Sequence, residues 1–176
     1  INNDGYLDVF GCHDDGLSRM WTGSPDGALT PAPGLIPLDD YLLADYSGND
    51  HSGNYGTVFT DFDNDGDIDL FIAKCRQFIS DPNDPRRINQ LWVNDGNGNF
   101  TEEANERGLV FYEQSWTVDF ADIDNDGDFD CLITNHSTTL YLFENDGLGY
   151  FTNITAGSGL EVEGFFLQAK MEDFDN

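Results

Sequence analysis

The sequence predicts an all-β protein assembled from repeated antiparallel units, and three observations support this prediction. An Asp-rich motif recurs, with complete copies at residues 61–69 and 122–130 and partial copies at 1–8 and 173–176. Short strand-like segments separate the copies, and a second, Gly-rich turn motif recurs in the same order. The equivalent residues Asp4, Asp65 and Asp126 lie 61 residues apart, and Asp124 and Asp175 lie 51 apart. A mean period of about 58 residues is within the range of propeller blades or repeat arrays.

The segments around each complete Asp motif are predicted to be strands. Residues 55–60 and 116–121 partly alternate between apolar and polar and lead directly into the two motifs. The runs 70–73 and 131–134 that follow are short and continuously apolar, as expected of strands buried on both faces. Third and fourth strands, at 140–143 and 151–155 in the later repeat, flank an Asn-Asp-Gly-x-Gly turn, which is a strong hairpin signal. No stretch has a helical period, and residues 102–107 suit one turn at most.

Four-stranded antiparallel units at this period predict the blades of a β-propeller. Residues 1–50 supply strands 2 to 4 of one blade and its connection, 51–111 and 112–163 are whole blades, and 164–176 is strand 1 of a fourth. About three blades are fewer than the 4–8 that usually close a ring. We therefore expect a fragment of a longer chain, or a ring completed by other copies; a stacked, open array is the alternative.

The turn motif also recurs, at 91–101 and 142–152, with a degenerate copy at 20–30 in which Ser24-Pro25 replaces Asp-Gly. A Gly-Leu pair follows each copy. Together with the Asp motifs, this pattern resembles the FG-GAP/VCBS repeats of integrin α-subunit propellers, cartilage acidic protein and large secreted bacterial proteins. The resemblance covers essentially the whole chain. It implies a propeller with calcium loops in an extracellular or cell-surface setting, and it implies no particular activity.

The Asp motifs are predicted to be calcium loops, because Ca²⁺ takes six to eight oxygen ligands and alternate carboxylates of a tight turn can converge on it. Gly66 and Gly127 permit the backbone conformation that such a turn needs. An EF-hand would require an acidic residue where the chain has Ile72 and Ile133. Mg²⁺ is disfavoured by its strict octahedral geometry. The expected ligands of the two complete sites are Asp61, Asp63, Asp65, Asp69 and the Asp67 carbonyl, and Asp122, Asp124, Asp126, Asp130 and the Asp128 carbonyl.

Up to two partial sites are expected at the chain ends. The first would use Asn2, Asp4, Asp8 and the Tyr6 carbonyl, and the last would use Asp173 and Asp175. Because the loop recurs in every blade and its ligand shell is saturated, we interpret the calcium as structural. The alternatives are a solvated acidic turn, which would leave carboxylates repelling one another, and a catalytic site.

Composition limits the function classes. Seven Lys and Arg against 34 Asp and Glu give a net charge of −27, which argues against nucleic acid or an anionic membrane as partner. With 39% hydrophobic and 14% aromatic residues the chain can build packed layers, provided that metal offsets the acidic loops. No apolar run approaches the roughly 18 residues of a membrane span. The three cysteines show no zinc or disulfide spacing and are expected to be buried thiols.

Ligand recognition is expected on the face opposite the Asp loops, which collects the loops that do not repeat. The long loop at 76–90 concentrates basic residues on an acidic chain and would suit an acidic glycan or an acidic partner loop. In the alternative interpretation its arginines pair with Asp81 and Asp84. Tyr41 and Tyr46 lie in the long connection to the next blade. The candidate residues of this face are Lys74, Arg76, Arg86, Arg87, His13, His51 and His136.

Three Asn-x-Ser/Thr sequences, at Asn99, Asn135 and Asn153, are candidate glycosylation sites. Two of them lie on a predicted outer strand, where a glycan would have room.

The function expected from these features is that of a calcium-stabilised, non-catalytic extracellular propeller used for adhesion, assembly or partner binding. No nucleophile elbow or phosphate loop occurs in the sequence. One alternative is a carbohydrate-binding or polysaccharide-lyase-type propeller, in which the basic loop neutralises a uronate. Another is a subunit of an extracellular filament, in which a neighbouring copy donates the missing loop ligands.

Overall fold

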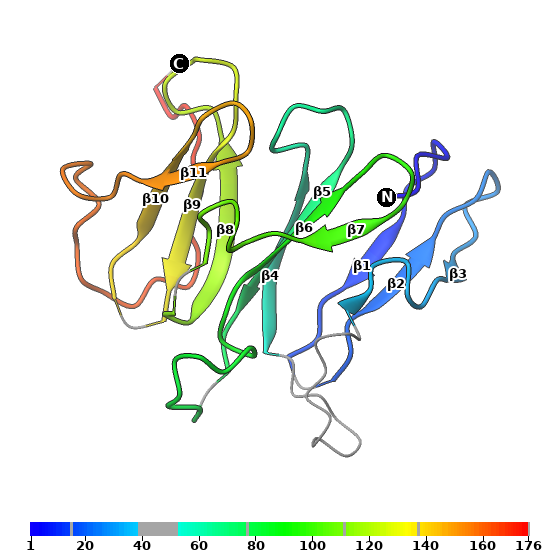
Figure 1. Ribbon diagram of the computed structural model, residues 1–176, viewed down its shortest axis with the longest axis horizontal. Helices are drawn as coiled ribbons and strands as arrows, with labels where there is room; N and C mark the ends of the chain where they lie inside the picture. The colour runs from blue at the N-terminus through cyan, green and yellow to red at the C-terminus, as the bar shows by residue number, and fades with distance from the viewer. Residues whose placement is uncertain (15, 39–52, 77, 111, 137, 176) are drawn as a thin grey trace.

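The computed structural model describes residues 1–176 except 15, 39–52, 77, 111, 137 and 176. Within the described residues, every regular element is a β-strand, and the strands form three antiparallel sheets (Figure 1). The first sheet contains β1 (Val9–Gly11), β2 (Arg19–Thr22) and β3 (Thr30–Pro31). The second contains β4 (Asn54–Thr60), β5 (Asp69–Lys74), β6 (Gln90–Asn94) and β7 (Phe100–Glu102). The third contains β8 (Ser115–Ala121), β9 (Asp130–Asn135), β10 (Tyr141–Asn145) and β11 (Phe151–Asn153).

Each sheet is an antiparallel meander in which every strand pairs with its neighbours in the sequence. The two four-stranded sheets repeat even in their irregularities, since β4 and β8 both shift register against the following strand at their second and third residues. We number the sheets blades 1, 2 and 3 in chain order. The prediction of an all-β fold of four-stranded blades is confirmed, with strand ends within about two residues of those expected.

The blades stack face to face, and the alternation of side chains along β5 shows why its sequence is continuously apolar. Leu70 and Ile72 pack in a cluster shared with blade 1, whereas Phe71 and Ala73 pack in a cluster shared with blade 3. All four are at most 1% exposed. Successive side chains of a strand point to opposite faces, so a strand between two neighbouring blades needs apolar residues at every position.

The two ends of the blades differ in character (Figure 1). The loops that carry the Asp motifs, between β4 and β5 and between β8 and β9, lie at the same end as the β6–β7 and β10–β11 turns. The β5–β6 and β9–β10 loops lie at the opposite end. The first strands β4 and β8 pack against each other; a Cβ built on Gly56 would lie 2.7 Å from Thr117 Cα.

Residues 164–175 form no strand in the structure, so the expected first strand of a fourth blade over 164–176 stays a prediction. The segment nevertheless lies against β8. The Lys170 ammonium pairs with Asp119, and the Met171 amide donates to Asp119 Oδ2 over 2.7 Å. The single predicted turn after β7 is present, with Arg107 N donating to Glu103 O over 2.9 Å.

Candidate metal centre

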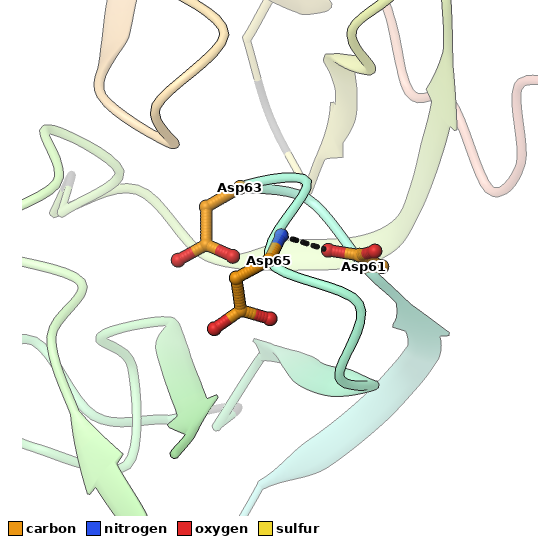
Figure 2. Close-up of side chains that lie close together, drawn as sticks. All are labelled: Asp61, Asp63 and Asp65. Atoms are coloured by element: carbon orange, nitrogen blue, oxygen red, sulfur yellow. Dashed lines mark hydrogen bonds between the residues drawn. The ribbon is translucent and has the colours of Figure 1, made fainter. Parts of the chain in front are cut away.

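The Asp motif between β4 and β5 (loop 2, residues 61–69) brings three carboxylates together. One oxygen from each of Asp61, Asp63 and Asp65 lies within 4.8 Å of the others, and Figure 2 shows the three side chains around the turn. Asp61 holds the turn closed, because its Oδ1 accepts from Asp65 N over 3.1 Å and its Oδ2 accepts from Gly66 N over 3.0 Å. The loop backbone therefore determines where the carboxylates lie.

The motif between β8 and β9 (loop 3, residues 122–130) repeats this arrangement with a slightly different set. Here oxygens of Asp122, Asp124 and Asp130 lie within 4.8 Å of one another. Asp122 again closes the turn, since its Oδ1 accepts from Asp126 N over 3.2 Å and its Oδ2 from Gly127 N over 3.1 Å. Each loop thus gathers three of its predicted carboxylate ligands. Asp69 is outside the cluster of loop 2, and Asp126 is outside that of loop 3.

The fourth position of the motif has a conformational role that sequence reasoning missed. Asn3, Asn64 and Asn125 all have positive φ, at 55°, 59° and 65°. Asn tolerates the left-handed region better than most residues with a side chain. Gly66 and Gly127 also have positive φ, at 94° and 100°, as expected. The recurrence of Asn at this position was the signal available in the sequence.

The Asp at the ninth position of each complete motif, Asp69 or Asp130, is buried and hydrogen-bonds two separate backbone segments; we call it the clamp. Asp69 is 0% exposed; its Oδ1 accepts from Asn94 N over 2.8 Å, and its Oδ2 accepts from Phe62 N over 3.4 Å. Asp130 bonds in the same way to Asn145 N over 2.9 Å and Ile123 N over 3.1 Å. The carboxylate therefore ties the start of each Asp loop to the end of the third strand. Burial raises the pKa of Asp69 to about 7, and nearby Asp63 contributes to the rise.

The residue at the seventh position of the motif was predicted to bind the cation through its backbone carbonyl. Its side chain also has a defined environment. Asp67 Oδ1 accepts from the Asn3 amide of the preceding loop over 2.9 Å. Asp128 is 6% exposed, and its Oδ1 has no hydrogen-bond partner. Burial and the neighbouring carboxylates of Asp126 and Asp130 raise the pKa of Asp128 to about 6.

The donor set fits a hard divalent cation. Every clustered group is a carboxylate, which is the ligand type that Ca²⁺ prefers. In loop 2 the buried Oδ1 of the clustered Asp63 has no hydrogen-bond partner; in loop 3 the buried Asp128 Oδ1 also has none, although Asp128 is not one of the three clustered residues. Burial, together with the charge of Asp65, raises the pKa of Asp63. Since buried polar atoms are normally satisfied, an unpaired oxygen beside two further carboxylates is the environment that a cation would complete.

The partial motifs at the chain ends do not gather such clusters among the described residues. In the first, exposed Asp4 accepts from the Asn2 side chain over 3.0 Å and from Tyr6 N over 2.9 Å. Asp8 keeps the clamp role, with Gly23 N donating to its Oδ1 over 2.9 Å. In the last motif, Asp173 and Asp175 are both exposed.

The basic residues of the opposite face are largely engaged within the protein. Arg86 is 7% exposed, and its Nε and Nη2 donate to Asp84 over 2.7 and 2.5 Å. Arg87 donates to the Ile79 carbonyl over 3.1 Å, Lys74 is buried, and Arg76 lies 3.6 Å from Asp14 Oδ1. The interpretation that the arginines pair within their loop is confirmed for Arg86. These residues do not form an exposed basic patch.

The histidines of that face have local roles. His13 Nδ1 accepts from Gly16 N over 2.8 Å, and the His136 ring stacks on Trp116 with centroids 5.4 Å apart. His51 lies outside the described residues, as do Tyr41 and Tyr46.

A hollow of about 210 Å³ lies on the same face, between the β1–β2 and β5–β6 loops and the start of β4. It is lined by Asp14, Tyr55, Arg76 and Phe78, and the Phe78 side chain is 99% exposed.

The candidate glycosylation sites differ in accessibility. Asn99 and Asn153 are exposed. Asn135 is 0% exposed, and its amide donates to the Thr139 carbonyl over 2.8 Å. A glycan at Asn135 is therefore incompatible with the folded structure, because the acceptor nitrogen is enclosed and already bonded.

Fold and site define a repeat β-propeller class in which acidic loops recur at the same end of successive blades. Residues 1–72 and residues 61–133 each match the FG-GAP-like repeat, and the chain belongs to that family. Each match runs from one Asp loop to the strand after the next loop. A comparison with curated proteins gave no match. No helix long and apolar enough to span a bilayer occurs in the described part of the chain.

Proposed function

We propose that this chain is a calcium-stabilised β-propeller module of an extracellular protein, with a non-catalytic role in adhesion, assembly or partner binding. The observation that carries the proposal is the convergence of three carboxylates in each of two corresponding loops, together with buried oxygens that lack a partner. FG-GAP-like repeats are typical of extracellular proteins, which supports the setting.

The residues that would hold Ca²⁺ are Asp61, Asp63 and Asp65 in loop 2 and Asp122, Asp124 and Asp130 in loop 3. A bound Ca²⁺ would supply the positive charge that offsets the repulsion among these carboxylates. The ninth-position clamps would transmit the gain in stability to the blades, because Asp69 and Asp130 bond to the backbone where the third strands end. Recurrence of the same loop in successive blades supports a structural role over a catalytic one.

Calcium titration of the chelated protein tests the proposal. We expect two tight sites by calorimetry and a melting temperature that falls when EGTA is added. The double variant Asp65→Asn/Asp124→Asn changes one clustered carboxylate in each loop and should lose most of the calcium-dependent stabilisation, whereas exposed Glu163→Gln removes a charge outside the loops and should retain it. Equal melting temperatures with and without chelator would overturn the structural-calcium role.

We place partner recognition on the face opposite the Asp loops, where exposed Phe78 and the hollow beside it support a protein contact. The acidic-glycan candidate has less support, since Arg86 is paired with Asp84 and Arg87 with backbone carbonyls. Arg76, which lines the hollow, is the basic residue on which that candidate depends. Binding to polyuronates that is lost in Arg76→Gln would favour the glycan; no binding to a polyuronate panel would leave the protein partner.

A further inference from the structure

Arg107 lies where loop 2 meets the β10–β11 turn of blade 3. Its Nη2 lies 3.3 Å from Asp63 Oδ2, and its Nε lies 2.9 Å from Glu103 Oε2. Across the junction, its Nη1 donates to the Leu148 carbonyl over 2.6 Å, and its Cζ lies 4.9 Å from the ring centroid of Tyr150. The side chain is 12% exposed. One guanidinium therefore contacts a candidate calcium ligand and the neighbouring blade.

The two carboxylate oxygens of Asp63 have different surroundings. Oδ2 faces Arg107, whereas Oδ1 is buried without a hydrogen-bond partner, and one oxygen of Asp63 belongs to the carboxylate cluster of loop 2. Blade 3 also restricts this residue sterically, because a Cβ built on Gly149 would lie 2.7 Å from Asp63 Cβ. The Asp63 carboxylate is thus constrained from outside its own loop as well as by the loop backbone.

At the position that corresponds to Arg107, the described part of blade 3 has no basic residue. The Gly-Leu pairs at 108–109 and 159–160 align Arg107 with Ser158, which cannot form an ion pair. The chain therefore contains two nearly identical Asp loops, of which loop 2 has a buried cation beside it.

We propose that Arg107 is a positioning residue that makes loop 2 a weaker calcium site than loop 3 and stabilises the blade 2–blade 3 junction when calcium is absent. This inference rests on the calcium sites proposed above. The guanidinium attracts the carboxylates of the empty loop, and bound Ca²⁺ would cancel much of that attraction and repel the guanidinium. Arg107 therefore stabilises the empty loop more than the filled one. By linkage, its removal strengthens calcium binding and weakens the calcium-free protein.

The test compares the full chain with Arg107→Gln, Arg107→Lys and Arg19→Gln, each in an Asp124→Asn background that weakens loop 3, so that titration reports loop 2. Arg107→Gln should bind Ca²⁺ on the order of tenfold more tightly, and it should melt at a lower temperature in EGTA. Arg107→Lys retains the charge and should stay close to the parent affinity. Arg19→Gln makes the same change in net charge at an exposed position of blade 1 and should alter neither quantity.

The outcomes separate the two proposals. If the parent protein binds no Ca²⁺, the calcium sites themselves are refuted. If the parent binds Ca²⁺ while Arg107→Gln binds with equal or lower affinity, the role of Arg107 is refuted and the calcium sites stand. If Arg107→Gln does not fold, the variants Asp124→Asn and Asp65→Asn decide, because they report loop 2 and loop 3 respectively. Loop 2 must then be the weaker site, and equal or tighter binding there overturns the inference.

Discussion

The side-chain amide of Asn145 donates to the Phe62 carbonyl over 2.7 Å, joining the turn of blade 3 to the Asp loop of blade 2. The same amide donates to the Phe129 carbonyl of its own Asp loop over 3.1 Å, and Asn145 Oδ1 accepts from Gly149 N over 2.9 Å. Asn145 is 3% exposed. A buried amide with this many partners connects two blades and the end of a hairpin at a single residue.

Replacing this residue should therefore destabilise the protein more than replacing its counterpart in blade 2. Asn94 donates to Ile68 O over 3.2 Å and accepts from Gly96 N over 3.1 Å, and both of these bonds lie within blade 2. We expect Asn145→Ala to lower the free energy of unfolding by about 2–4 kcal/mol, because several buried groups lose their partner. The decrease in the free energy of unfolding should be about 1–2 kcal/mol smaller for Asn94→Ala. Urea unfolding in excess Ca²⁺ measures both, and equal losses would contradict the bridging role.

Asp69→Asn should damage the fold as well as the calcium response, whereas Asp65→Asn should affect mainly the latter. Asp69 uses both oxygens to accept backbone N–H groups, and an amide can replace only one of them. Asp65 is exposed and accepts one bond, from Asp67 N over 2.9 Å, which an amide oxygen can still accept. In EGTA we expect Asp69→Asn to lower the free energy of unfolding by about 2 kcal/mol and Asp65→Asn to leave it nearly unchanged. Chemical denaturation without calcium distinguishes them; a larger loss for Asp65→Asn would refute the clamp.

The stability of the calcium-free protein should increase as the pH falls from about 7 to 5. The pKa of Asp69 is about 7 in the folded state against an ordinary value of 3.8, so the folded state binds this proton more tightly than the unfolded state. The stabilisation contributed by a carboxyl group with a raised folded-state pKa is present at low pH, and it is lost as the pH rises through that pKa. Asp128, with a pKa of about 6, acts in the same direction.

With saturating Ca²⁺ the trend should reverse, because protons then compete with the cation for the same carboxylates. Melting curves at pH 5.0, 6.0 and 7.5, recorded in EGTA and in excess Ca²⁺, provide the comparison. Parallel trends in the two series would rule out the loops as the origin of the pH dependence.

Gly108→Ala should open the junction between blades 2 and 3. Gly108 has φ +83°, and a Cβ built on it would lie 2.4 Å from the Phe151 carbonyl oxygen. Gly157 has nearly the same φ, +86°, with nothing within 4 Å of a built Cβ. Gly157→Ala should cost about 1–2 kcal/mol through its backbone alone, and Gly108→Ala should cost at least about 2 kcal/mol more. The free energies of unfolding of the two variants, measured in excess Ca²⁺, test this; similar values would show that the junction tolerates the methyl group.

Much of the fold could be predicted from local pattern. The continuous apolar runs of β5 and β9 indicated strands buried on both faces, and the Asn-Asp-Gly-x-Gly turns indicated the outer hairpins. The regular spacing of Asp61, Asp63 and Asp65 indicated a cluster of carboxylates. These features are local because strand alternation and tight turns depend on residues a few positions apart.

The relationships between blades could not be predicted in this way. Arg107 is one basic residue among seven in the sequence, and its pairing with Asp63 depends on a contact 44 residues away. The basic loop left two interpretations open, a binding surface or internal ion pairs, and only the structure shows that the backbone turn places Asp84 against Arg86.

The sequence by itself determined the repeat, the blade and the chemistry of the Asp loops, because each depends on residues close together in the chain. The tertiary structure alone decided which carboxylates are clamps, which remain available for a cation, and that two nearly identical loops are not equivalent. Asp69 acts as a clamp because it accepts a hydrogen bond from the end of β6. Asp63 lies beside the buried guanidinium of Arg107 because blade 3 packs against loop 2. Burial and the charge of distant neighbours set these roles, and both arise only when the blades are stacked.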